Sequence, residues 1–277
     1  MKFALIQMPT TKDKKQNLQI AGDYIRRAAA AGARVAILPE MFCCPYSNKA
    51  FPMFAEEADG MLCTALAQLA KENGLTLVAG SIPERCGDWL YNTSFVFDEA
   101  GRQIARHRKI HLFDVCIDGG QQFQESAVFS PGCEPTIFTV DGIRIGLCIC
   151  FDIRFPELFR TMALEGAQAV IVPAAFNMTT GPLHWELSFR MRAVDNQLFT
   201  IGVAPARDTA RSYVSYANSI VCSPWGVPVA NAGTEPNLLL VDIDFDEVAQ
   251  VRRQLPLLAA RRPEVYRSRE DVNIAQK

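Results

Sequence analysis

The chain alternates short apolar runs with longer segments in which apolar residues recur every three or four positions. Nine runs rich in β-branched residues predict strands. They are Phe3–Gln7, Val35–Pro39, Thr76–Ile82, Thr93–Asp98, Arg144–Cys150, Ala169–Ala175, Thr200–Ala204, Ser219–Cys222 and Leu238–Ile243. Helical periodicity covers Asn17–Ala31, Gly60–Asn73, Phe155–Glu165 and His184–Gln197. The pattern therefore predicts an α/β protein.

The predicted strands leave few polar positions, as in the run AVIVPAA from Ala169 to Ala175. Strands of this kind are covered on both faces, here by helices on one side and by another sheet on the other. We therefore expect a layered α/β sandwich. Because no internal repeat, low-complexity tract or Gly/Ser-rich linker marks a boundary, we expect a single domain over residues 1–277.

A C-terminal arm is expected from about Val251, and six arginines surround its apolar segment LPLLAA. These arginines are Arg252, Arg253, Arg261, Arg262, Arg267 and Arg269. Since a charge run is usually a solvated face, we favour a solvated or partner-docking tail over an anion-binding patch.

Charge and composition narrow the choice of partner and compartment. The formal net charge is −2, from 28 Lys and Arg against 30 Asp and Glu, so no broad field favours nucleic acid or an anionic membrane. The apolar run from Phe3 to Met8 ends at Pro9, and no run approaches the roughly 18 apolar residues of a membrane helix. We therefore expect a cytoplasmic protein whose nine cysteines are mostly reduced core residues.

Cys150 is the first candidate for catalysis. It closes the apolar run RIGLCIC and is followed at once by the helical segment from Phe155. A strand-to-helix turn presents a side chain outside the sheet and aims backbone N–H groups towards it, which favours a thiolate. The residues alone leave open that Cys150 is one more core cysteine, and Cys148 points to the same face of the strand. The position next to the turn favours Cys150.

Glu40 and Lys109 are candidate partners of that sulfur. Glu40 ends the run VAILPE, where desolvation would raise the carboxyl pKa and suit a general base. Lys109 lies in the segment ARHRKIHLFD, where an inward ammonium could stabilise a thiolate and an oxyanion. Taken singly, Glu40 is more simply explained as a surface glutamate in a loop, and Lys109 as part of an exposed charge run.

The sequence predicts no metal and no cofactor. His107 and His111 are four residues apart, but the glutamate of the zinc-protease motif is missing, and Arg108 and Lys109 would repel a cation. The cysteines also lack zinc-ligand spacing. No glycine-rich phosphate cradle of either standard pattern occurs.

Three segments, read in order, resemble the catalytic motifs of the nitrilase superfamily of carbon–nitrogen hydrolases. They are LPEMF with Glu40, RKIHLFD with Lys109 and GLCICFDIRFPE with Cys150. The segment FQES places Glu125 at the family's second glutamate. The resemblance covers nearly the whole chain, and the stretch Phe176–Gln197 is similar to the omega-amidase branch. In one departure, Ala217-Asn218 stands where relatives commonly have Gly-His.

This resemblance implies a four-layer αββα sandwich, a homodimer paired through a helical face and the C-terminal arm, and no cofactor. It also implies hydrolysis of the terminal amide of dicarboxylic acid monoamides such as α-ketoglutaramate and α-ketosuccinamate. In that reaction Cys150 is the nucleophile and Glu40 the base. Lys109 and the backbone N–H of Phe151 hold the oxyanion, and Glu125 positions Lys109.

The substrate's far carboxylate needs donors, and the candidates are Tyr46, Arg154 and Thr180. Arg154 could instead pair with Asp152 or Glu157. The alternatives in function are another amidase of the superfamily, such as a deaminated-glutathione amidase or a carbamoyl-amino-acid hydrolase, and a non-catalytic binding protein that kept the fold. The presence of all three catalytic residue types argues against the last.

Overall fold

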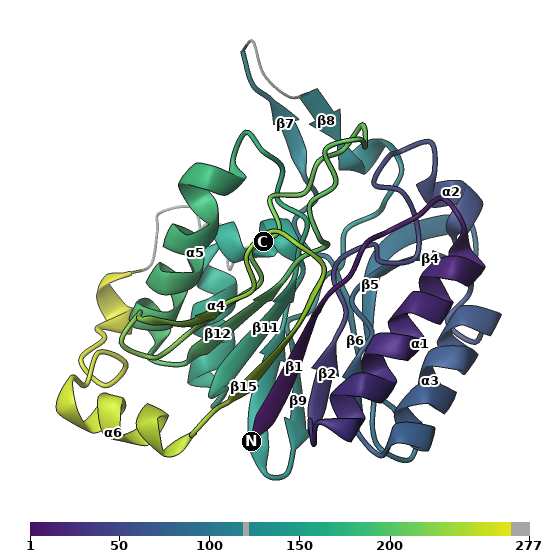
Figure 1. Ribbon diagram of the computed structural model, residues 1–277. Coiled ribbons are helices and arrows are strands. Elements are labelled where there is room, and N and C mark those ends of the chain that lie inside the picture. The colour runs from purple at the N-terminus through teal and green to yellow at the C-terminus, as the bar shows by residue number, and fades with distance from the viewer. Residues whose placement is uncertain (119–121, 267–277) are drawn as a thin grey trace.

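The computed structural model describes residues 1–118 and 122–266. Two sheets lie face to face, and helices cover the outer face of each (Figure 1). Three separate apolar clusters fill the spaces between these layers, one between the sheets and one beneath each pair of helices. The predicted α/β class and the four-layer αββα sandwich are therefore confirmed.

The first sheet has the strand order β15-β1-β2-β3-β5-β4, with β6 paired to β5. Its strands are β1 (Lys2–Gln7), β2 (Val35–Ile37), β3 (Thr76–Val78), β4 (Ile82–Cys86), β5 (Trp89–Phe97), β6 (Gln103–Arg108) and β15 (Asn237–Asp242). The central strands β1, β2 and β3 run parallel, and the outer pairings are antiparallel.

The second sheet has the strand order β14-β13-β12-β11-β10-β9. Its strands are β9 (Thr136–Val140), β10 (Ile143–Leu147), β11 (Ala169–Pro173), β12 (Phe199–Val203), β13 (Ile220–Cys222) and β14 (Pro228–Asn231). A separate hairpin pairs β7 (Asp114–Cys116) with β8 (Gln122–Gln124). In Figure 1 this hairpin projects from the end of the sandwich opposite the N-terminus.

Side chains alternate between the layers, as strand geometry requires. In β1, Phe3 and Leu5 pack between the sheets, whereas Ala4 and Ile6 face the helices. The same alternation occurs in β11. Both faces are buried, which explains why these strands contain so few polar residues.

Helices α1 (Lys14–Ala30) and α3 (Met61–Asn73) cover the first sheet, and α4 (Pro156–Leu164) and α5 (Gly181–Asn196) cover the second (Figure 1). The Asp13 side chain accepts the backbone N–H groups of Lys15 and Gln16 and so caps α1. Gly74 ends α3 with φ 59°. Two further helices are α2 (Phe51–Phe54) and α6 (Asp246–Gln254).

Two predicted strands end three or more residues earlier than expected. The expected strand Thr76–Ile82 divides into β3 and β4 because Gly80 turns the chain with φ 46°, and a Cβ there would lie 2.1 Å from the Pro39 carbonyl oxygen. The expected strand Arg144–Cys150 ends at Leu147. Cys150 instead begins the 3₁₀ helix η2 (Cys150–Arg154).

Helix α6 includes position 251, where the sequence suggested that an arm begins, and Val251 is buried. Arg252 donates to the backbone carbonyls of Gln197 and Ala167. Of the six arginines expected in this segment, Arg267 and Arg269 lie outside the described residues.

All nine cysteines lie in the described part of the chain and all are free. Six are buried, as expected of reduced core residues, and Cys86, Cys116 and Cys133 are exposed.

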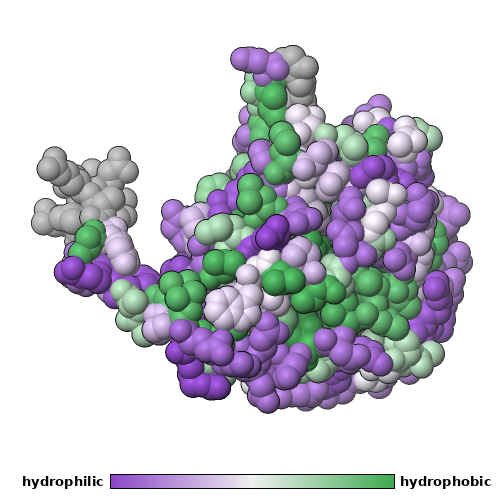
Figure 2. Space-filling view, turned by 60° about the vertical axis from the view of Figure 1, so that its left-hand side comes forward, coloured by the Kyte–Doolittle hydropathy of each residue, from purple (hydrophilic) through white to green (hydrophobic). Residues whose placement is uncertain are grey.

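Among the described residues, no helix combines the length and the apolar character needed to cross a bilayer. Figure 2 shows apolar patches on the face reached by turning the left side of Figure 1 forward.

Candidate active site

Cys150 lies at a sharp turn between β10 and α4. Its φ is 46°, in the left-handed region that residues with a Cβ rarely adopt. The Asp152 carboxylate accepts the backbone N–H of Ile149 at 3.0 Å and so closes this turn. Strained backbone of this kind persists where the surrounding structure fixes it, and it clusters at functional sites.

Glu40 follows the end of β2 in the other sheet and is 1% exposed. The next residue, Met41, also has a positive φ, 52°, and its N–H donates to the Ser81 hydroxyl at 3.2 Å. The turn after β2 thus directs a carboxylate into the protein, towards the end of the sandwich where Cys150 lies.

Lys109 follows β6 and is completely buried. Its Nζ donates to Glu40 Oε1 at 3.0 Å and to Glu125 Oε2 at 2.8 Å. Glu125, in the 3₁₀ helix η1 (Glu125–Ala127), also accepts the backbone N–H of Phe113 at 2.7 Å. The structure therefore brings together one ammonium and two carboxylates that are 69 and 16 residues away from it in sequence.

Burial and charge set the protonation of this group. Burial favours the neutral acid and raises the pKa of Glu40, against the opposing effect of the Lys109 charge. Burial alone would lower the pKa of Lys109, but Glu125 and Glu40 outweigh it and raise the pKa. Lys109 therefore stays charged.

The Cys150 thiol faces the Glu40 carboxyl group, the Lys109 ammonium and the backbone N–H of Ala175. Burial, and then the Glu40 charge, raise the thiol pKa, whereas Lys109 and the Ala175 N–H lower it. Burial thus favours the neutral thiol at Cys150, next to the Glu40 carboxyl group. Glu40 Oε2 has no nitrogen or oxygen donor among the described residues, which leaves it available for the thiol proton.

Asn92 is a member of this network that the sequence did not reveal. Its Nδ2 donates to Glu40 Oε1 and to Glu125 Oε1, both at 2.9 Å, and the residue is 1% exposed. It therefore holds the two carboxylates on either side of Lys109. The only sequence signal is an amide-bearing residue inside the strand segment LYNTSF.

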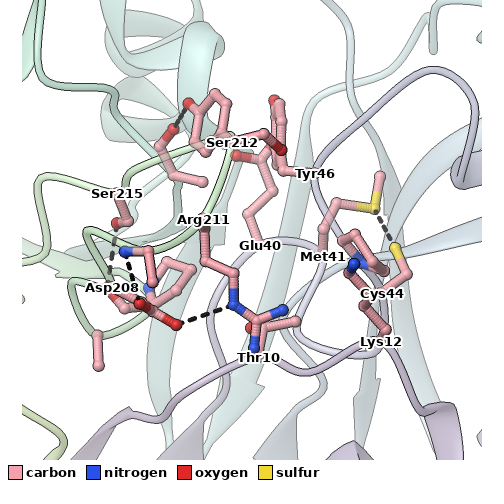
Figure 3. Close-up of a pocket in the computed structure, with 16 residues that line it drawn as sticks. Thr10, Lys12, Glu40, Met41, Cys44, Tyr46, Asp208, Arg211, Ser212 and Ser215 are labelled. Carbon is pink, nitrogen blue, oxygen red and sulfur yellow. Dashed lines mark hydrogen bonds and ion pairs between the residues drawn. The ribbon is translucent and has the colours of Figure 1, made fainter.

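Two cavities border the site, a larger one that we call the outer cavity and a smaller one that we call the inner cavity. The outer cavity, about 350 Å³, is lined by Glu40, Tyr46 and the ion-paired Arg211 and Asp208 (Figure 3). The inner cavity has only about 10 Å³ and contains Cys150.

Tyr213 and Ala175 line both cavities and separate them. The Tyr213 hydroxyl donates to the Ala175 carbonyl, and the Tyr213 ring stacks on Tyr46 with centroids 4.4 Å apart. Nothing in the pattern of the sequence singled out Tyr213, which lies in the long loop between β12 and β13.

The predicted substrate-binding residues divide between these cavities. Arg154 and Thr180 line the inner cavity with Cys150 and Phe151. Tyr46 lines the outer cavity, with its hydroxyl 3.5 Å from Glu40 Oε1.

Arg154 is a half-buried cation beside the candidate nucleophile. Its guanidinium lies 5.0 Å from the Phe176 ring centroid, and Nη1 is 3.0 Å from His184 Nδ1. No carboxylate of the described residues pairs with it, and burial lowers its pKa. The alternative pairing with Asp152 does not occur, because the Asp152 carboxylate binds two histidines instead.

Ala217 and Asn218 stand where the sequence differs from the usual Gly-His of relatives. Both residues have left-handed backbones, with φ 59° and 60°. The Asn218 carbonyl accepts the Trp185 indole N–H at 2.7 Å, so this pair anchors the loop against α5.

Across residues 1–118 and 122–266, no group of three or more His, Cys, Asp or Glu side chains is arranged to hold a metal ion.

Comparison with known families gives one model that matches nearly the whole chain. The carbon-nitrogen hydrolase model matches residues 2–253. Omega-amidase NIT2 of Homo sapiens is 44% identical over 265 residues, or 96% of each chain. Its counterpart in Xenopus tropicalis is 43% identical over 272 residues, covering 98% of this chain and 99% of the relative.

Solved structures agree with this match. Nit3 of Saccharomyces cerevisiae, described as a member of branch 10 of the nitrilase superfamily, is 36% identical with a TM-score of 0.87, covering 96% of this chain and 97% of its own. A glutamate-to-glutamine variant of the amidase from Nesterenkonia sp. AN1 is 27% identical with a TM-score of 0.77, covering 96% of this chain and 95% of its own. That structure shows covalent addition of the acetamide moiety of fluoroacetamide at its active-site cysteine.

Proposed function

The chain belongs to the carbon-nitrogen hydrolase family, and from this premise we propose that it is an omega-amidase. The reaction is hydrolysis of the terminal amide of dicarboxylic acid monoamides such as α-ketoglutaramate and α-ketosuccinamate. The products are the 2-oxo dicarboxylate and ammonia. Cys150 is the nucleophile, and Glu40, Lys109 and Glu125 are its catalytic partners.

In the first half of the reaction, Glu40 takes the proton of Cys150 while the sulfur attacks the amide carbon. The tetrahedral oxyanion is held by the Lys109 ammonium and by the backbone N–H of Phe151. Such donors are most effective in a buried site, where water does not compete with them. The C–N bond then breaks, and the nitrogen leaves as ammonia with the proton that Glu40 received from the thiol.

In the second half, Glu40 removes a proton from water, and the resulting hydroxide attacks the acyl thioester. The C–S bond breaks, the carboxylic acid is released and the thiol regains its proton. Glu125 and Asn92 fix the Lys109 ammonium and the Glu40 carboxylate throughout both steps. One base thus serves both halves of the reaction.

The observation that carries this proposal is the guanidinium of Arg154, which lies beside Cys150 and has no carboxylate partner among the described residues. A half-buried cation without such a partner is costly, and a substrate carboxylate would compensate it through charge-assisted hydrogen bonds. Arg154 would therefore hold the far carboxylate, with the Thr180 and Tyr46 hydroxyls as further donors to the substrate.

The test is a substrate panel in which ammonia release is followed. We expect rapid turnover of α-ketoglutaramate, slower turnover of glutamine, little turnover of a simple nitrile, and none by the Cys150→Ala variant. Deaminated glutathione and an N-carbamoyl amino acid serve as substrates of the two rival branches. Preference for either of these, or equal turnover of the nitrile, would remove the omega-amidase assignment.

A second experiment distinguishes recognition of the substrate carboxylate from the catalytic steps. Arg154→Ala should raise KM for α-ketoglutaramate by roughly ten- to a hundredfold, the loss expected when a hydrogen bond to a charged group is removed. KM for a neutral amide such as butyramide should change little. Equal loss for both substrates would show that Arg154 does not bind the carboxylate.

We also propose a homodimer that acts in the cytoplasm. Leu183, Leu187 and Met191 form an exposed apolar stripe along α5, at 71%, 63% and 46% exposure. Residues four apart on a helix share one face, and an exposed apolar stripe favours pairing with a second copy. The C-terminal arm would add to this contact. Nine free cysteines are typical of a reducing compartment.

A further inference from the structure

Two histidines flank Lys109 in sequence, and both bind the same buried carboxylate. His107 Nε2 lies 3.0 Å from Asp152 Oδ2, and His111 Nδ1 lies 2.8 Å from Asp152 Oδ1. The side chains of His107 and Asp152 are completely buried, and that of His111 is 28% exposed. Neither histidine takes a role in the chemistry proposed above.

Asp152 also holds the turn that carries the nucleophile. Its Oδ2 accepts the Ile149 N–H at 3.0 Å, and its Oδ1 accepts the His111 N–H at 2.9 Å. Each carboxylate oxygen therefore has two donors. Three of the four donors come from the segment around Lys109, and the fourth comes from the residue before Cys150.

A carboxylate only accepts hydrogen bonds, so the ring nitrogens that face it, His107 Nε2 and His111 Nδ1, carry the protons of these contacts. His107 Nδ1 lies 3.0 Å from the Thr136 hydroxyl. The His111 ring stacks on Phe155, at 3.5 Å between centroids and 8° between planes, just before α4. Each ring thus has one contact in addition to its contact with the carboxylate.

We propose that Asp152, together with His107 and His111, is a positioning group that fixes the Lys109 ammonium relative to the Cys150 sulfur. The inference rests on the proposed function. Lys109 and Cys150 belong to different sheets, and a displacement of about 1 Å between reacting groups can cost about a hundredfold in rate. One carboxylate that binds both segments prevents that displacement, and it also fixes the left-handed turn at Cys150.

Asp152→Asn is the first test, because it preserves volume but replaces one acceptor oxygen with a donor that faces two N–H groups. We expect kcat for α-ketoglutaramate to fall about a hundredfold with KM changed less than about threefold. The rate of alkylation of Cys150 by iodoacetamide should fall in parallel. A kcat near that of the wild type would overturn the proposal.

Glutamine and asparagine, whose side-chain amides also carry N–H groups, can replace the histidines. If the contact with Asp152 matters, the amide that reaches the carboxylate should preserve more activity than the other, which a merely structural role would not predict. Glutamine places an N–H near the position of histidine Nε2, and asparagine places one near Nδ1. His107→Gln should therefore retain more kcat than His107→Asn, and His111→Asn more than His111→Gln. If both substitutions at each position gave equal losses, the carboxylate contact would not be what matters. His111 is partly exposed, so its variants keep the test open if Asp152→Asn fails to fold.

The control is Asp98→Asn. Asp98 is 6% exposed and accepts the backbone N–H groups of Ala100 and Arg102 in the turn after β5, away from the site. We expect a lower Tm with unchanged kcat. If the wild type did not hydrolyse α-ketoglutaramate, the proposed function would fail, whereas the alkylation rates would still decide whether Asp152 positions the sulfur.

Discussion

At the scale of single residues, the site contains a few buried charged side chains, and each of them has a partner. Glu40 and Glu125 share one ammonium, Lys109, and one amide, Asn92. A buried carboxylate without such partners would be protonated at neutral pH and could not act as a base. Asn92 therefore matters because it donates a hydrogen bond to both carboxylates.

The dependence of kcat/KM on pH should show how burial and hydrogen bonding together set the pKa of Glu40. Burial raises the pKa of Glu40 above its ordinary value of 4.5, and the base must be ionised, so kcat/KM should rise with pH through a pKa above 4.5. Asn92→Ala removes a donor to the ionised carboxylate and should move this acid limb to higher pH. A limb at or below pH 4.5, or a shift to lower pH in the variant, would contradict this account of Glu40.

At the scale of elements, the sequence predicts the long apolar strands and their helices but not the turns that form the site. Cys150 and Glu40 were candidates because each ends an apolar run, and the resemblance to the nitrilase motifs then selected them together with Lys109. The end of β10 was misplaced because the Asp152 carboxylate binds the Ile149 N–H, a contact that periodicity cannot reveal. Strand β6, with the sequence QIARHR, was missed because its charged residues hide the alternation.

Other parts of the site had no sequence signal. Asn92 occupies a strand position that looks like any half-buried residue, and its two carboxylate partners are 52 and 33 residues away. Tyr213 lies in a long irregular loop, and its importance comes only from where that loop folds back, between the two cavities. Contacts of this range require the tertiary structure.

The Tyr213 loop provides a prediction at this scale. The inner cavity of about 10 Å³ has room for about one water molecule, so a lining side chain has to move before a substrate can reach Cys150. We expect that side chain to be Tyr213, because it lines both cavities. Tyr213→Ala should join the two cavities and speed the alkylation of Cys150 by iodoacetamide several-fold. Tyr213→Phe keeps the stack on Tyr46 and removes only the hydroxyl bond to Ala175, so it should have a smaller effect. Unchanged alkylation in Tyr213→Ala would mean that the ring does not control access.

At the scale of the whole molecule, the proposed catalytic residues come from both sheets. Glu40, the proposed base, follows a strand of the first sheet, and Cys150, the proposed nucleophile, follows a strand of the second. Lys109 and Asp152 connect the two. The layered sandwich is thus what brings distant segments together. The match to the carbon-nitrogen hydrolase model over residues 2–253 has the same extent as this fold.

The proposed dimer makes a prediction at this scale. Leu187→Glu places a charge in the middle of the apolar stripe of α5 and should shift the protein from dimer to monomer in analytical ultracentrifugation. Met53→Glu is the matched control, since Met53 is 74% exposed on α2, over the other sheet, and should leave the dimer intact. A wild type that sediments as a monomer, or a Leu187→Glu dimer, would rule out this interface.

The central claim is that Cys150 carries the acyl group between the two halves of the reaction. The most direct measurement is the intact mass of the protein after rapid mixing with α-ketoglutaramate and quenching in acid. The wild type should gain the mass of one acyl group, located on Cys150 by peptide mapping, and Cys150→Ala should gain none. Ammonia release by Cys150→Ala at the wild-type rate, or an acyl group on another residue, would contradict the account.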